Sequence, residues 1–188
     1  MAAAVLASAQ TAGARCGDAD PEISISACSG IIQSGRLGGR DLAVAHTHRG
    51  VAYVALLDYD RALQDFGQAI RIDPRLPAAF ANRGAVHGAR QDFEEAIADF
   101  TQVLALEPDS AAAFADRAAM YRLNGQHDEA IRDYGEAIAR KYAAALGKGL
   151  VPILCVGEQL AEREAGISTQ VVGRQLAAVV NLCGVRSL

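Results

Sequence analysis

Apolar residues recur every three or four positions through the middle of the chain, as they do along one face of an α-helix. Ala62, Phe66 and Ala69 form one such stripe. The stripe ends at Pro74, because the residue that precedes a proline disfavours the helical conformation. The pattern therefore predicts amphipathic helices joined by short turns, and an all-α fold.

The same pattern returns after 34 residues, a period typical of a helical-hairpin repeat. Equivalent positions carry similar side chains in two or three copies. The columns are Arg49-Gly50 over Arg83-Gly84 and Arg117-Ala118, Tyr53 over His87 and Tyr121, Ala62 over Ala96 and Ala130, Phe66 over Phe100 and Tyr134, and Pro74 over Pro108. Agreement across so many columns predicts three stacked hairpins, since one hairpin alone cannot bury both of its faces.

These columns resemble the signature of the tetratricopeptide repeat family. The family has a small residue in the first helix, an Ala in the second and a closing Pro, which the columns of Gly50, Ala62 and Pro74 match. The resemblance implies a helical-hairpin superhelix over 43–140, with repeats at 43–76, 77–110 and 111–140, the last one incomplete. It also implies a protein-interaction scaffold, not an enzyme, that binds a peptide or helix of another protein in its concave groove.

Family geometry directs Asn82 toward the concave side, where its amide can hold a ligand backbone. His48 and Asp116 hold the equivalent places in the flanking repeats, and Arg122 adds a further polar contact. The remaining predicted groove positions are small or aliphatic: Val51, Ala81, Ala85, Ala115 and Ala119. The side chains that clamp a peptide carboxylate in some family members are missing, so we expect an extended or helical apolar ligand. A groove without any ligand, in a purely structural repeat protein, remains the alternative.

One recurrence lies outside the family signature. Arg49, Arg83 and Arg117 each precede an aspartate by the same interval, at Asp65, Asp99 and Asp133. The arginine is expected on the first helix of its hairpin and the aspartate on the second. We predict an ion pair across each hairpin, bidentate in geometry. The alternative is a set of independent surface charges that contribute about 0–1 kcal/mol each.

The N-terminal part divides into a leader or disordered segment, 1–20, and a capping helix with its loop, 21–42. Residues 1–14 are Ala-rich but lack an early basic residue, so a truncated signal peptide and a disordered start are equally supported. If residues 1–14 are a truncated signal peptide, the protein is periplasmic or secreted; otherwise it is cytoplasmic. A pairing of Cys16 with Cys28 would require export, and free thiols are slightly favoured. Together with the repeats, the helix resembles a group of bacterial tetratricopeptide proteins that carry such a cysteine.

Residues 141–188 depart from the repeat. The run 149–158, GLVPILCVGE, and the residues that follow it resemble triosephosphate isomerase around its fifth strand. The family's catalytic Lys, His and Glu lie on segments that this chain does not match, and neither Glu158 nor Glu162 matches the base. The alternative function is thus a catalytically incompetent isomerase fragment joined to the repeats by gene fusion. We further predict that 168–182, or 141–146, covers the end of the array.

Charge and ligand chemistry narrow the function further. The net charge is −4 and no basic stripe is present, so nucleic acid is not expected as a partner. No apolar run approaches the roughly 20 residues of a membrane span. His46 and His48 are too few ligands for a metal, and core packing and groove lining, respectively, are favoured for them. No cofactor is implied.

Overall fold

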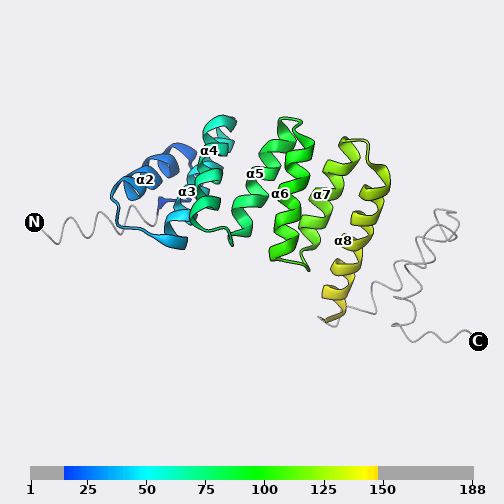
Figure 1. Ribbon diagram of the computed structural model, residues 1–188. Coiled ribbons are helices and arrows are strands. Elements are labelled where there is room, and N and C mark those ends of the chain that lie inside the picture. The colour runs from blue at the N-terminus through cyan, green and yellow to red at the C-terminus, as the bar shows by residue number, and fades with distance from the viewer. Residues whose placement is uncertain (1–14, 148–188) are drawn as a thin grey trace, which may run out of the picture.

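The computed structural model describes residues 15–147, with side chains through residue 144. Helices stand side by side in a row from the N-terminal to the C-terminal end of this part (Figure 1). They are α2 (Pro21–Gln33), α3 (Gly39–Ala55), α4 (Tyr59–Ile72), α5 (Pro77–Ala89), α6 (Phe93–Leu106), α7 (Ala111–Leu123) and α8 (His127–Gly147). Residues 15–147 contain no strand, so the all-α prediction is confirmed for them.

Consecutive helices form three hairpins. Helix α3 packs against α4, α5 against α6, and α7 against α8, while α4 meets α5 and α6 meets α7 between hairpins. Helix α2 packs against α3 at the N-terminal end. Every helix in the described ranges is too short or too polar to cross a bilayer.

The turn inside each hairpin has a left-handed residue at the same repeat position. These residues are Leu57 (φ 60°), Gln91 (φ 68°) and Gly125 (φ 79°), spaced by the repeat period. Glycine adopts this conformation without steric cost, whereas a residue with a Cβ does not. The next helix begins at once after the turn, and the Asp58 carboxylate accepts a hydrogen bond from the Arg61 backbone N–H at 3.1 Å to cap α4.

Helix α8 extends past the predicted end of the repeats. The repeat pattern ends at residue 140, and α8 continues without interruption to Gly147. Helices α4 and α6 are followed by Pro74 and Pro108, whereas no proline follows α8 at the equivalent position. Residues 141–146 include three alanines, a leucine and a lysine, which favour a helix, so α8 continues there.

The small-residue column marks where the two helices of a hairpin touch. A Cβ on Gly50 would lie 2.6 Å from Phe66 Cε1, and one on Gly84 would lie 3.1 Å from Asp99 Cβ. The third hairpin accommodates Ala118 at this place, fully buried. In hairpin one the close approach is to the buried Phe66 ring.

We expect Gly50→Ala to lower the free energy of unfolding by about 1–3 kcal/mol, because the buried Phe66 ring has no space to move away. Gly30→Ala is the matched control. A Cβ at Gly30 meets nothing within 4 Å, so this change is expected to stabilise the protein by about 0.5–1 kcal/mol through helix propensity. Urea denaturation of both variants measures the difference. Equal effects of the two changes would contradict the close contact.

Candidate peptide-binding groove

An arginine paired with a buried aspartate joins the two helices of each hairpin. Arg49 Nε donates to Asp65 Oδ2 at 2.7 Å and its second terminal nitrogen to Oδ1 at 2.8 Å. The Arg83–Asp99 pair has corresponding distances of 2.9 and 2.6 Å, and the Arg117–Asp133 pair 2.6 and 3.0 Å. The predicted bidentate ion pairs are thus confirmed, and the alternative of independent surface charges is wrong. The pairs fix the first helix of each hairpin against the second.

The three arginines are stabilised in their charged form. Hydrogen bonding to the paired aspartate raises the pKa of Arg49, Arg83 and Arg117 above its ordinary value, although partial burial opposes this shift. Two of the three also donate to a hydroxyl on the preceding helix. Arg49 bonds Ser29 Oγ at 3.0 Å and Arg117 bonds Thr101 Oγ1 at 3.1 Å.

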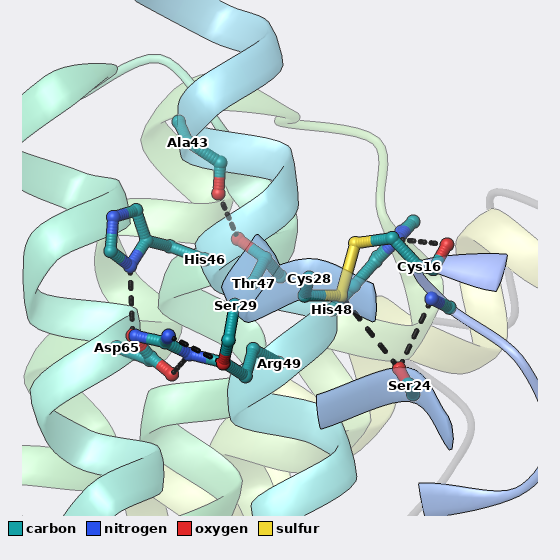
Figure 2. The surroundings of a disulfide bond; sticks show 11 residues. Cys16, Ser24, Cys28, Ser29, Ala43, His46, Thr47, His48, Arg49 and Asp65 are labelled. Atoms are coloured by element: carbon teal, nitrogen blue, oxygen red, sulfur yellow. Dashed lines mark hydrogen bonds and ion pairs between the residues drawn. A yellow bond between two sulfur atoms is a disulfide. The ribbon is translucent and has the colours of Figure 1, made fainter. Parts of the chain in front are cut away.

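Asp65 accepts one hydrogen bond more than its two equivalents. His46 Nδ1 lies 2.8 Å from Asp65 Oδ1, beside the two bonds from Arg49 (Figure 2). Burial raises the pKa of Asp65, but the hydrogen bonds from Arg49 and His46 outweigh it, and the pKa lies below its ordinary value. His46 was predicted to pack in the core; its side chain is 11% exposed and also makes this polar contact. No group of metal-ligating side chains occurs among the described residues.

A disulfide joins Cys16 to Cys28 and fastens the N-terminal segment to α2 (Figure 2). The slight preference for free thiols was therefore wrong. The chain turns at Gly17, whose φ is +95°, and the Gly17 N–H donates to Ser24 Oγ at 3.1 Å. This turn brings the two Cα atoms within 4.7 Å of each other, a separation that suits a disulfide.

The same N-terminal segment lies against His48. The Nδ1 atom of His48 is 3.3 Å from the carbonyl oxygen of Cys16. A Cβ on Gly17 would lie 2.7 Å from that nitrogen, so only glycine fits there. His48 remains exposed in part, but the disulfide-bonded turn covers one side of it. The first predicted groove position is thus shared with the N-terminal segment.

A shallow pocket opens between the first helices of hairpins one and two. Its volume is about 120 Å³. Its lining is apolar except for the Tyr59 hydroxyl and the Asn82 amide: Val51, Val54, Tyr59, Asn82, Ala85, Val86 and Ala89. Asn82 Nδ2 donates to the Ala78 carbonyl at 2.7 Å, which holds the amide at the pocket wall. A cavity of about 150 Å³ holds a benzene molecule, so this pocket fits a single apolar side chain.

Three of the predicted groove residues, Val51, Asn82 and Ala85, line this pocket. Ala81 lies elsewhere, half-buried against the core cluster around Phe80. The predicted positions on helix α7 and its end do not contribute to the pocket: Ala115, Asp116, Ala119 and Arg122. Their role in ligand binding stays a prediction.

Asp116 has an unusual environment for a surface carboxylate. Burial raises its pKa above the ordinary value, and no ion pair with a residue in 15–147 opposes that shift. It holds the repeat position equivalent to Asn82. Asp116 therefore offers an acceptor, and not a cation, to a peptide carboxylate.

Four pocket residues were missed from the sequence: Val54, Tyr59, Val86 and Ala89. Val54 and Ala89 lie one helical turn beyond the predicted Val51 and Ala85, so extending the predicted stripe by a turn would have found them. Tyr59 starts the second helix of the hairpin, and no repeat column marked it as a groove residue.

Two segments match models of the tetratricopeptide repeat, residues 43–76 and residues 77–110. The described array is a tetratricopeptide repeat fold. Among solved structures of tetratricopeptide type, it resembles MamA 41-end from Desulfovibrio magneticus RS-1, with a TM-score of 0.62 and 20% identity over 70% of this chain and 73% of that one. A crystal structure of MamA protein has a TM-score of 0.60 at 18% identity, covering 66% of each chain.

A shorter tetratricopeptide neighbour has a ligand. The second tetratricopeptide domain of Spaghetti (RPAP3) was solved bound to an HSP90 peptide, SRMEEVD. Its TM-score is 0.51 at 25% identity, over 58% of this chain and 97% of that one.

The end of the chain matches a different family. Residues 110–188 match the triosephosphate isomerase model, and this match begins inside the tetratricopeptide array. Curated triosephosphate isomerases share shorter stretches, 63% identical over 51 residues in Thiobacillus denitrificans and 62% over 47 residues in Delftia acidovorans. These stretches cover 27% and 25% of this chain. The chain spans about a fifth of the length of these curated relatives, 21% and 19%. Glu158 and Glu162, neither of which matches the family's base, lie outside the described residues, as does Cys155.

Proposed function

We propose that this chain is a scaffold that binds an apolar peptide segment of another protein along the first helices of its hairpins. The observation that carries the proposal is the pocket between α3 and α5, with apolar walls and one amide at its edge. Its volume is below the roughly 300–1,000 Å³ of small-molecule sites, so a cofactor-sized ligand does not fit. A peptide does fit, because it can insert one side chain into the pocket while its backbone continues along the groove.

The charge of the groove separates this chain from its peptide-bound neighbour. The RPAP3 domain was solved with an acidic peptide, SRMEEVD. In this chain His48, Asn82 and Asp116 occupy the same groove position in the three hairpins. The residues that line the pocket include no Lys or Arg. An acidic peptide terminus beside Asp116 would meet a second carboxyl group. We therefore propose an apolar ligand, extended or helical, with Asn82 bonding its backbone and Arg122 available at the far end.

The test begins with a displayed library of 12-residue peptides selected on the wild-type chain. A selected peptide is labelled, and its affinity is measured by fluorescence anisotropy against variants. Ala85→Glu introduces a carboxylate at the pocket wall, so it is expected to weaken binding at least about tenfold. Asn82→Ala is expected to weaken binding by a similar factor through a lost hydrogen bond.

Ala105→Glu, at an exposed position of α6, is the matched control and should leave affinity unchanged. Selected peptides that are rich in acidic residues would contradict the proposed ligand. So would equal binding by the Ala85→Glu and Ala105→Glu variants.

We propose further that the chain has the organisation predicted from its repeats, with the array at 43–140 and the isomerase-like segment at 141–188. That segment would have no isomerase activity, since a fifth of the enzyme's length supplies only a small part of a barrel. Interconversion of triose phosphates by the purified chain, abolished by Glu158→Gln or Cys155→Ser, would overturn this.

A further inference from the structure

Helix α8 has an apolar face that no described residue covers. Ile131 and Ile138 are 69% and 55% exposed. They are two helical turns apart, so they lie on the same side of α8. Single exposed apolar residues are ordinary on protein surfaces, but two large ones aligned on one helix face form an apolar stripe that another helix could cover.

The repeat itself indicates what this face is for. One period earlier Ile138 corresponds to Leu104, which is 8% exposed and packs with Phe80 and Ala113. Two periods earlier it corresponds to Ile70, which packs against the same cluster. In both cases the first helix of the next hairpin, α5 or α7, covers the residue. The face of α8 is thus shaped to receive one more helix.

We propose that the segment 168–182 of this chain docks on the face of α8 formed by Ile131 and Ile138, and so closes the repeat array. The segment has apolar residues at helical spacing, including Val172, Leu176 and Val179. Its aliphatic side chains have the same apolar character as the two isoleucines that they would cover.

The chain length permits this return. Helix α8 has 21 residues and is about 30 Å long. The 20 residues between Gly147 and 168 span up to about 70 Å when extended, so they reach any point along α8. A tether of this kind gives an effective concentration in the millimolar range, which favours the chain's own segment over a second copy. The isomerase-like segment then serves as the terminal packing layer of the repeat array.

The experiment uses the full chain and two substitutions, Ile138→Ser on α8 and Leu176→Asp in the segment. Each is expected to lower the melting temperature by about 3 °C or more, because each removes one side of the same apolar contact. The double variant should fall no further than the single ones, since residues in contact are not additive. Hydrogen exchange at the amides of α8 should speed up in the Leu176→Asp variant.

Leu57→Ser is the control, at a residue that is 72% exposed in the turn before α4. It should leave the melting temperature and the exchange of α8 unchanged. Three results would overturn the proposal. The first is that Leu176→Asp does not alter the exchange of α8, and the second is that the effects of the two substitutions add. The third is a melting temperature that rises with protein concentration in the wild type but not in Ile138→Ser, which would assign the face to a second copy.

Discussion

Replacing Asp65 by alanine is expected to lower the free energy of unfolding by about 3 kcal/mol at neutral pH, the low end of the cost of breaking a buried ion pair. The Asp65 side chain is 5% exposed and accepts hydrogen bonds from Arg49 and His46. Its loss leaves the Arg49 guanidinium without its bidentate partner between two packed helices. Urea denaturation followed by circular dichroism measures the change.

Asp60→Ala provides the control on the same helix. The Asp60 side chain is 85% exposed and pairs with Arg90 at 2.7 Å, so its removal should cost less than about 1 kcal/mol. If the two substitutions destabilise the protein equally, the buried pair has no special role in holding the hairpin.

The effect of Asp65→Ala should also depend on pH with a definite sign. Because the pKa of Asp65 is lowered in the folded state, its contribution is complete above the pKa of the unfolded chain, about 3.9. The contribution is lost as the pH falls through the lower folded-state value. The difference in unfolding free energy between wild type and variant should therefore stay constant from neutral pH to about pH 5 and shrink below about pH 4. A difference that grows toward low pH would contradict the assignment.

Reducing the Cys16–Cys28 disulfide is expected to lower the free energy of unfolding by about 3 kcal/mol, as for loops of roughly 15 residues. The two cysteines are 12 positions apart, and Cys28 is fully buried on α2. Reduction releases the turn at Gly17 from α2 and from the side of His48 that it covers. Guanidinium denaturation with and without a reductant measures the loss.

Cys16→Ala should show the lower stability with or without reductant. Cys155→Ala and Cys183→Ala are the matched controls, and each should keep the full sensitivity of the wild type to reductant. A wild-type denaturation midpoint that is unaffected by reductant would show that the disulfide contributes nothing to the stability.

Much of the fold was predictable because the same sequence pattern occurs three times along the chain. A column such as Gly50, Gly84 and Ala118 repeats the same kind of residue, which makes the assignment of each helix more secure than a single copy would. The constant interval of 16 residues predicted the arginine–aspartate pairs from the sequence. The repeats also predicted the pocket residues Val51 and Asn82 from the first helices.

Features that occur only once were harder to predict. The disulfide depends on a left-handed turn at Gly17, and the spacing of two cysteines does not reveal it. The hydrogen bond of His46 to Asp65 has no counterpart in the other hairpins, where Phe80 and Phe114 hold that column. Helix α8 continues past Arg140 because no proline occupies the position equivalent to Pro74 and Pro108. Helix propensity alone then decides the conformation of these residues.

The arginine–aspartate pairs bear on how the array forms. Each pair joins residues only 16 positions apart and closes a contact inside one hairpin, while contacts between hairpins are mainly apolar. Contacts that are local in sequence form early, because little chain entropy is lost in closing short loops. A hairpin can thus form as a unit and act as a nucleus on which its neighbours assemble in sequence. The central hairpin packs against another hairpin on each side, so it would open last.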